Sequence, residues 1–195
     1  EAENQVLCSH LEAVLPNYDL VVVVDYGHGM LGQDAVDLLC QRARFLAVNT
    51  QANAGNRGFN TISKYPRVDY LCVSENEIRL DARNRRQSLD SIIQSASDRL
   101  SCPSIVITKG ANGCVSYSAK DGLFETPAFA IQVVDRVGAG DAVFAVTSLC
   151  VAQDAPMDIV GFIANAVGAE AVATVGHRDT IDHMSLSRHI EYLFK

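Results

Sequence analysis

Four consecutive residues in the last third of the chain, Gly138-Ala139-Gly140-Asp141, are the strongest chemical signal in the sequence. They follow an apolar run that ends at Val134 and open a helical pattern, so they fall where a helix begins. Small side chains at that point let a phosphate approach bare backbone N–H groups, and the helix dipole favours its negative charge. A carboxylate beside this anion can accept a proton from an attacking hydroxyl, so the pattern predicts phosphoryl transfer. A plain helix start, with Asp141 as an ordinary first-turn carboxylate, is the alternative.

Helical and extended patterns alternate along the rest of the chain and must position these residues. Residues 20–24 form a β-branched run without polar alternation, which is typical of a strand buried on both faces. Further strands are expected at 45–48, 70–73 and 104–108, a hairpin at 114–118 and 123–126 around Lys120-Asp121-Gly122, and one more strand at 130–134. Helices are expected at 6–15, 35–43, 89–100, 139–152, 157–173 and 185–194, and residues 49–60, rich in Asn and Gly, must form a loop.

Repeated β-α units predict an α/β fold with a mainly parallel sheet covered by helices on both faces. We expect one domain over residues 1–195, with ligands gathered at the carboxyl ends of the strands. The chain lacks an initiator Met and begins inside a helical pattern, so we expect a part of a longer protein.

Bulk properties exclude several classes of protein. The net charge is −7 and no basic run is longer than Arg85-Arg86, which disfavours a nucleic-acid partner. No apolar run approaches the ~20 residues of a membrane span, and no basic segment leads into an apolar one as in a signal peptide. The six cysteines are spread without a Cys-x-x-Cys pair, which predicts buried free thiols and a cytoplasmic protein.

The segment 135–141, Asp-Arg-Val-Gly-Ala-Gly-Asp, followed by a helix of small residues, resembles the C-terminal signature of the ribokinase-like (PfkB-type) carbohydrate kinases. The resemblance implies that Asp141 is the general base and that the backbone of Gly138, Ala139 and Gly140 forms an anion hole. The family usually has Thr where this chain has Arg136 and Val137, which affects the surroundings of the phosphates or of a monovalent cation.

Two segments resemble the nucleotide-binding elements of this family. Thr108-x-Gly110-x-x-Gly113 lies at the end of an expected strand, like the family's Thr-x-Gly-x-x-Gly turn beside the nucleotide phosphates and ribose. The helix that carries Asn165 and Gly168 resembles the wall of the adenine pocket, where small residues admit a flat ring. Taken alone, the first segment also fits a plain glycine turn and the second fits tight helix packing.

A third segment, Ser74-Glu75-Asn76-Glu77, stands where the family has an Asn-x-x-Glu element that organises Mg²⁺ and phosphate through water. Glu77 matches that element, whereas Ser74 replaces the usual Asn. The resemblance implies that Ser74, Glu77 and Asp135 organise the metal and the phosphates. Four weak signals in the family's order along the chain make the resemblance strong.

Near the N-terminus, the turn that begins at Asp25 resembles the Asp-Tyr-x-Lys-Gly turn of the heptose-phosphate kinase branch, with His28 where Lys is common. Asn49-Thr50-Gln51 stands where that branch tends to have Asp-Pro-Lys. These residues form a candidate active-site turn that has lost positive charge. The loss leaves open a weakened or inactive kinase.

The resemblance implies a three-layer α/β/α fold that lacks the family's N-terminal sugar-binding and lid portion. It implies ATP- and Mg²⁺-dependent phosphoryl transfer to a hydroxyl of a sugar or sugar phosphate, with a monovalent cation as a further cofactor. We expect a homo-oligomer, fused to a nucleotidyltransferase domain in the parent protein. The alternative is a nucleotide-binding pseudokinase module of a larger bifunctional protein.

Residues 27–32 match Gly-x-Gly-x-x-Gly after a strand, so a dinucleotide-binding oxidoreductase domain is a second alternative. Against it, the next strand ends at Asn49 where ribose recognition needs an acidic residue, and Asp25 would face the pyrophosphate. The helix is also expected to begin near Gln33, after the last glycine.

Other enzyme classes lack their motifs, since the sequence contains neither a Gly-x-Ser-x-Gly elbow nor a Walker-type loop. His177, Asp179 and His183 could suggest a metal site, but a solvated polar loop explains them better because ligand histidines usually have helical or hairpin spacing.

Overall fold

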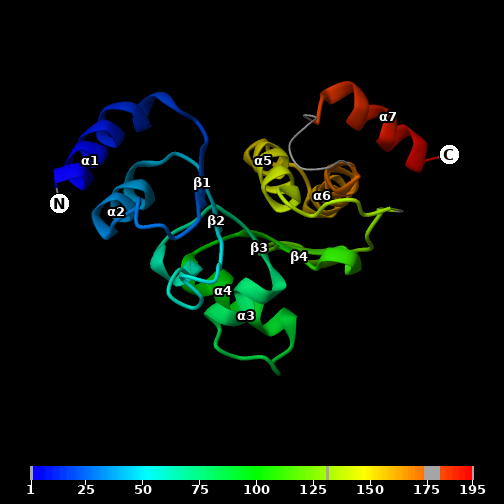
Figure 1. Cartoon of the computed structure of the whole chain (residues 1–195), viewed down its shortest axis with the longest axis horizontal. Helices are drawn as coiled ribbons and strands as arrows, with labels where there is room; N and C mark the ends of the chain where they lie inside the picture. Colours follow the sequence, from blue (N-terminus) through cyan, green and yellow to red (C-terminus); the bar gives the residue numbers. More distant parts are fainter. Residues whose placement is uncertain (1, 131, 174–180, 195) are drawn as a thin grey trace.

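The computed structural model describes residues 2–130, 132–173 and 181–194, which form a six-stranded sheet with helices on both faces (Figure 1). Strands lie in the order of the sequence, and the first four run parallel while the last two form an antiparallel hairpin. The mainly parallel three-layer α/β/α arrangement expected from the sequence is confirmed. The strands are β1 (Val21–Asp25), β2 (Leu46–Thr50), β3 (Tyr70–Ser74), β4 (Ser104–Thr108), β5 (Cys114–Ser118) and β6 (Gly122–Thr126).

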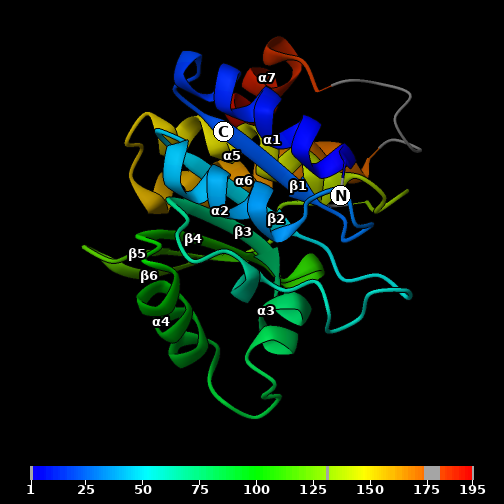
Figure 2. The ribbon, with the colours of Figure 1, turned by 90° about the vertical axis from the view of Figure 1, so that its left-hand side faces the viewer.

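The helices lie on the two faces of this sheet, and Figure 2 shows α1 and α2 beside β1 and β2. Short 3-10 turns occur at Leu15–Asn17, Ile62–Lys64 and Gly110–Asn112. The α-helices are α1 (Ala2–Val14), α2 (Gln33–Arg42), α3 (Glu75–Asp81), α4 (Leu89–Leu100), α5 (Ala139–Ala152), α6 (Met157–Val172) and α7 (His183–Leu193). None of them, in the part of the chain that the structure describes, is both long and apolar enough to span a membrane.

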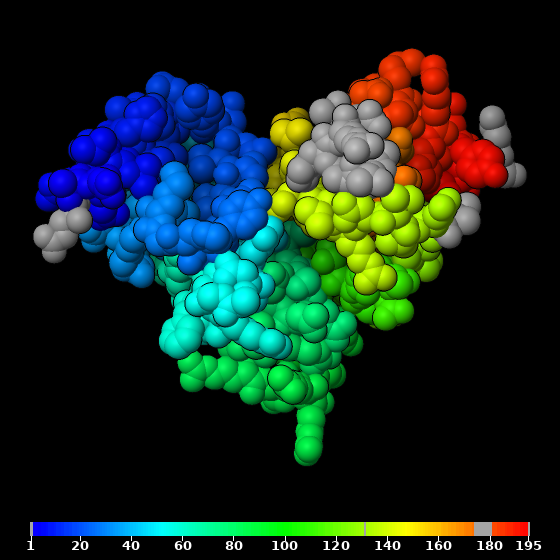
Figure 3. Space-filling model, viewed as in Figure 1, coloured from blue at the N-terminus to red at the C-terminus, as the bar shows by residue number. Residues whose placement is uncertain are grey.

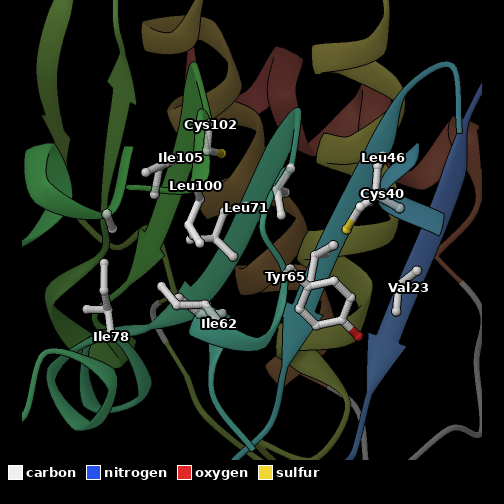
Figure 4. Packing of buried hydrophobic residues seen from close by; sticks show 14 of the residues in the cluster. Val23, Cys40, Leu46, Ile62, Tyr65, Leu71, Ile78, Leu100, Cys102 and Ile105 are labelled. Carbon is white, nitrogen blue, oxygen red and sulfur yellow. The ribbon is translucent and has the colours of Figure 1, made fainter. Parts of the chain in front are cut away.

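Alternate residues of the central strands belong to two hydrophobic clusters, one on each face of the sheet. Leu71 and Val73 of β3 pack with apolar residues of α2, α3 and α4, whereas Tyr70 and Cys72 pack with α5 and α6. The period of two follows from strand geometry, in which successive side chains point to opposite faces. The Tyr70 ring stacks on Phe144 of α5, with ring centroids 6.1 Å apart. Figure 4 shows part of the cluster on the α2–α4 face.

β1 departs from the expectation of a strand buried on both faces. It has only β2 as a neighbour among the described strands, and the side chain of Val22 is 41% exposed. Val23, on the α2 face, is buried. The apolar run was read correctly as a strand, but its edge position depends on strand order, which the run does not encode.

Two further differences between the expected and the observed secondary structure concern segments whose apolar residues show no clear helical or strand periodicity. The expected strand at 130–134 is wrong, because the described residues of that stretch form none; the N–H groups of Val134 and Asp135 donate instead to Val172 O at the end of α6. The sequence analysis missed α3, which is too short to show a helical period. Ser74 and Glu77 form a capping box at its start, so the Ser-x-x-Glu spacing was its available signal.

The cysteines are free, as expected, although Cys8 and Cys150 are only half-buried. Burial raises the pKa of the Cys72 and Cys102 thiols to about 12, so these two stay protonated at neutral pH. Of the histidines and aspartate considered for a metal site, His183 is the first residue of α7, and His177 and Asp179 lie outside the described residues.

The buried carboxylate of Asp25 holds the carboxyl end of β1. Its oxygens accept hydrogen bonds from the Tyr65 hydroxyl at 2.7 Å and from Gly27 N at 2.9 Å, and it pairs with Lys64 Nζ at 2.6 Å. Figure 4 shows the Tyr65 ring within the core with its hydroxyl pointing toward β1. Burial disfavours the charged form, but the bonds from Lys64, Tyr65 and Gly27 outweigh it and hold the pKa of Asp25 below its usual value.

Tyr65→Phe should therefore destabilise the protein by ~1.5–3 kcal/mol near neutral pH, because a buried carboxylate loses a donor. A carboxyl group whose pKa is lowered by folding contributes stability above its unfolded pKa of 3.8, and this is lost as the pH falls through the lower folded value. Urea unfolding at pH 7 and below pH 4 should show the difference from wild type shrinking in acid. Tyr117→Phe is the control, because it removes the hydroxyl of a mostly buried tyrosine that forms no hydrogen bond to another described residue. Equal losses in both variants at pH 7 would contradict the role of the Asp25 bond.

The turn between β4 and β5 depends on Gly113, whose φ is +81° and whose missing Cβ leaves room for the chain after β6. An added Cβ would lie 2.0 Å from Thr126 O and 2.7 Å from Ala128 N, both backbone atoms. We expect Gly113→Ala to lower the free energy of unfolding by more than ~3 kcal/mol, because a steric clash adds to the cost of a positive φ. Gly122→Ala, at φ +89° with open space around it, should cost only ~1–2 kcal/mol. Denaturant titrations of the two variants test the difference, and similar values would contradict it.

Candidate active site

The carboxylate of Asp141 lies in the first turn of α5 and contacts the turns that follow β1 and β2. Gln51 Nε2 donates to Asp141 Oδ1 at 2.8 Å, and the Tyr26 hydroxyl donates to Asp141 Oδ2 at 3.2 Å. The two partners are 90 and 115 residues away in the sequence. The structure thus brings three polar groups together at the carboxyl edge of the parallel strands, where α/β folds bind ligands.

Backbone N–H groups are available beside this carboxylate. Gly138 has φ +78° and caps α5, and Gly140 has open space where a Cβ would stand. The N–H of Ala139 bonds to Arg136 O and that of Ala142 to Gly138 O. Within the described residues the N–H groups of Gly140 and Asp141 have no acceptor, as is usual in the first turn of a helix. The turn can therefore receive an anion at the positive end of the helix dipole.

A cavity of about 290 Å³ adjoins this turn. Ala139 and Gly140 line it, and so do all the residues that the sequence analysis assigned to nucleotide binding: Thr108, Gly110, Gly113, Asn165 and Gly168. We call it the nucleotide cavity. The end of β4 and the start of the hairpin supply one wall, and α6 supplies the other.

The side chain of Asn165 joins the walls of the nucleotide cavity. Its amide nitrogen donates to Gly161 O at 2.9 Å and to Thr126 O at 3.4 Å, and it lies 3.1 Å from Cys114 Sγ. These bonds fix α6 against β5 and β6. Asn165 therefore sets the shape of the cavity, since its donor group is already engaged.

Arg136 also lines the nucleotide cavity, and the sequence alone did not identify it as a candidate binding residue. In the sequence it stands out only as a departure from the Thr that the family usually has. Arg136 is exposed, forms no ion pair with any described carboxylate, and lies two residues before the turn at Gly138. The signal available in the sequence was a lone basic residue beside an anion-binding turn in an acidic protein.

Residues of the loop after β2 hold the Asp141 contacts in place. Asn56 Nδ2 and Asn53 Nδ2 donate to Tyr26 O at 2.7 and 2.9 Å, and Asn60 Nδ2 donates to Asp25 O at 2.8 Å. We call these three residues the asparagine clamp. Figure 3 shows their cyan loop lying against the blue N-terminal part of the chain. The clamp joins the turns that carry Tyr26 and Gln51, and the sequence analysis had recognised it only as a loop.

The four residues of the candidate active-site turn separate into two pairs. Gln51 contacts Asp141, whereas His28 is exposed and has its Nε2 3.4 Å from Asn53 Nδ2. Asp25 and Asn49 are buried instead, and Asn49 Nδ2 donates to Cys72 O at 2.7 Å. The second pair holds strands and turns together, and its polar atoms do not reach Asp141.

The residues expected to organise a metal are largely engaged within the protein. Glu77 Oε2 accepts from Ser74 N and Ser74 Oγ at 2.8 and 2.7 Å, and Oε1 accepts from Ala52 N at 3.1 Å. Asp135 Oδ1 accepts from Val137 N at 3.0 Å. Among the described residues, no group of three His, Cys, Asp or Glu side chains could hold a metal ion. These carboxylates fit Mg²⁺ only in its usual nucleotide-bound mode, with one or two carboxylates, water and substrate phosphates.

Tyr26 remains a hydrogen-bond donor in this site. Burial and the negative charge of Asp141 raise the pKa of its phenol above the usual value. The proton in the pair therefore stays on the tyrosine at neutral pH. Asp141 is the group with the capacity to accept a proton.

Several known proteins resemble this chain in sequence. The model of the pfkB family carbohydrate kinases matches residues 5–184. A protein named bifunctional protein HldE from Citrifermentans bemidjiense is 28% identical over 178 residues, which are 90% of this chain and 36% of that protein. Its namesake from Bradyrhizobium diazoefficiens is 27% identical over 181 residues, again 36% of its length. The chain thus spans about a third of these curated relatives.

Solved structures agree on the fold. Phosphofructokinase-2 from Escherichia coli, in complex with potassium, superposes with a TM-score of 0.80 at 14% identity, over 98% of this chain and 63% of that one. Arabidopsis thaliana ribokinase complexed with ribose and ATP gives a TM-score of 0.74 at 16% identity, over 94% and 59%. These matches rule against the dinucleotide-binding alternative. The order of the described strands, β1-β2-β3-β4, agrees, because it shows no reversal of the kind found in a dinucleotide-binding sheet. The chain belongs to the pfkB family of carbohydrate kinases.

Proposed function

We propose that this chain is the nucleotide-binding and catalytic part of a kinase that transfers a phosphoryl group from ATP to a hydroxyl of a sugar or sugar phosphate, with Mg²⁺. The observation that carries the proposal is the carboxylate of Asp141 beside the free N–H groups of the α5 turn, next to the nucleotide cavity. A base, an anion site and a nucleotide pocket in contact are the parts that phosphoryl transfer requires.

In this proposal adenine enters the nucleotide cavity between the hairpin and α6, where glycine and alanine side chains leave space for a flat ring. The phosphates extend toward Gly138, Ala139 and Gly140, where the backbone N–H groups and the helix dipole stabilise negative charge. Arg136 adds a positive charge on the same side. This placement explains how a protein of net charge −7 receives an anionic nucleotide.

Asp141 acts as the base on the other side of the transferred group. Gln51 holds Oδ1, which fixes the plane of the carboxylate, while Oδ2 already accepts a hydrogen bond from a hydroxyl, that of Tyr26. An acceptor hydroxyl bound there gives its proton to Asp141 as its oxygen bonds to the phosphorus and ADP leaves. Positioning of this kind supplies much of the rate acceleration in phosphoryl transfer.

Mg²⁺, when bound with the nucleotide, would neutralise charge on the phosphate oxygens. Asp135 and Glu77 are the described carboxylates that we assign to it, acting through water because their oxygens already accept hydrogen bonds. Ser74 keeps Glu77 in place through the capping box. A monovalent cation near the α5 turn stays a prediction.

We also propose what the rest of the parent protein contains. The chain covers 36% of relatives whose name includes the word bifunctional, which supports a second catalytic domain, a nucleotidyltransferase, elsewhere in the parent. The chain also covers only 63% of the phosphofructokinase-2 chain, which supports a further portion with sugar contacts. We further propose a cytoplasmic homo-oligomer.

Asp141→Asn in the parent protein should lower kcat by ~10²–10⁴ and change the ATP dissociation constant by less than about threefold, because only the proton acceptor is lost. The matched control is Asp158→Asn, which removes an exposed carboxylate from the first turn of α6 and so tests the helix dipole alone. Steady-state kinetics and calorimetry measure the two effects. Turnover by the Asp141→Asn variant at the wild-type rate would contradict the role of base. ATP binding by the wild type without turnover of any sugar would favour the pseudokinase alternative.

Gly140→Val should weaken ATP binding at least tenfold, because the side chain would project into the nucleotide cavity where the phosphates approach the backbone. Its melting temperature should change little, since no atom lies within 4 Å of the added Cβ. Ala145→Val, at an exposed position of α5, controls for a β-branched residue in the helix. Calorimetry measures the affinity for ATP. An affinity unchanged from wild type would mean that the turn only begins the helix and does not bind the phosphates.

A further inference from the structure

The hydroxyl of Tyr26 lies where the proposed function places the hydroxyl of the acceptor. It donates to Asp141 Oδ2 at 3.2 Å, while Gln51 Nε2 donates to Oδ1 at 2.8 Å. A general base takes the proton of a hydroxyl that donates a hydrogen bond to it, so the group bound at Oδ2 decides which oxygen is activated. In this structure that group is a side chain of the protein itself.

The phenol of Tyr26 fills this position in its neutral form. Burial and the negative charge of Asp141 raise the pKa of the phenol above its usual value, so it keeps its proton at neutral pH. Tyr26 therefore fills the position without presenting an oxyanion that could attack the phosphate.

The backbone of Tyr26 is held in place, whereas its side chain is free to turn. Asn53 Nδ2 and Asn56 Nδ2 donate to Tyr26 O at 2.9 and 2.7 Å. Tyr26 is 45% exposed, its hydroxyl bonds to Asp141, and its ring makes an edge contact with the His28 ring at a centroid distance of 6.3 Å. Exposed side chains change rotamer readily, so the hydroxyl can leave Asp141 without any change in the turn.

A cavity of about 500 Å³ beside β1 has room for the displaced ring. Tyr26 and His28 both line this cavity, and its other lining residues are mainly apolar, among them Leu11, Val24 and Met30. Such a lining suits an aromatic ring, because removal of its carbon atoms from water is favourable. The side chain of Tyr26 thus has a second place beside the one that it occupies against Asp141.

We propose that Tyr26 protects the nucleotide from hydrolysis, because its hydroxyl keeps water away from Asp141 Oδ2 until a sugar hydroxyl displaces it. This inference rests on the proposed kinase function and assigns a specificity-determining residue to the same site. Without the Tyr26 hydroxyl, a water molecule at Oδ2 gives its proton to Asp141 while its oxygen bonds to the γ-phosphorus. The bond between that phosphorus and the departing ADP breaks in the same step, so ATP is lost as ADP and phosphate.

The first test uses water as the acceptor and needs no sugar. Release of inorganic phosphate from ATP by the parent protein is measured with no sugar present. Tyr26→Phe keeps the ring and removes one oxygen, which leaves room for water, so it should raise the rate of hydrolysis at least tenfold. Tyr26→Phe/Asp141→Asn should lose this gain, because the water then has no base. Tyr18→Phe, at an exposed tyrosine outside the site, is the matched control and should leave the rate unchanged.

A second test separates this role from one in which Tyr26 only orients Asp141. Ribose, fructose 6-phosphate and a heptose 7-phosphate are tried in turn as acceptors. For an acceptor that the wild type phosphorylates, Tyr26→Phe should raise kcat/KM at least threefold, because the sugar no longer has to displace a bound hydroxyl. The same variant should phosphorylate fewer sugars for each ATP consumed. An orienting role predicts the opposite, a lower kcat/KM without additional release of phosphate.

The outcomes distinguish this inference from the proposed function. If the wild type phosphorylates a sugar and Tyr26→Phe hydrolyses ATP no faster than the wild type, the inference alone is wrong. A gain in hydrolysis that survives Asp141→Asn would also overturn it, because the water would not act through this base. If the wild type binds ATP and phosphorylates none of the acceptors, and Tyr26→Phe hydrolyses no ATP, the proposed function and the inference both fail.

Discussion

The site depends on one contact, in which the first turn of α5 meets the turns at the carboxyl ends of β1 and β2. Asp141 makes this contact through Gln51 and Tyr26, whose side chains belong to two different turns. The asparagine clamp ties those turns together through the backbone oxygens of Asp25 and Tyr26. The proposed role of Asp141 as a base requires such bracing, because small displacements of a catalytic group are costly.

Buried residues on both faces of the sheet hold the elements that make this contact in place. Asp25 sits below the β1 turn with Tyr65 and Lys64, and its charge is compensated inside the fold. On the opposite face of the sheet, Phe144 of α5 stacks on Tyr70 of β3 and so anchors the helix that carries Asp141. A buried ion pair is weak evidence for stability, but here it fixes the position of a turn that the site requires.

The structure has two cavities whose linings differ in charge and polarity. The nucleotide cavity is lined mostly by small and apolar residues, as suits a flat heterocycle, whereas the cavity of about 670 Å³ between the loop after β2 and α3 is lined by three arginines and one glutamate. The protein as a whole is acidic, so attraction of anions depends on these local groups. The start of α5 and Arg136 lie at one cavity, and three arginines, Arg57, Arg79 and Arg85, line the other.

The sequence by itself determined the six strands of the sheet, although it also predicted a strand at 130–134 that does not form, and it determined the long helices, the parallel sheet and the family. Apolar periods and glycine spacing are local properties of the chain. It also determined that residues 138–141 begin a helix with a carboxylate in its first turn. Only the tertiary structure decided that Asp25 and Asn49 are buried, that Gln51 reaches Asp141, and that β1 pairs only with β2 among the described strands. It likewise decided that Arg57 and Arg85 line one hollow. Such facts depend on which loops meet in space, and no spacing along the chain specifies contacts between residues 90 or 115 positions apart.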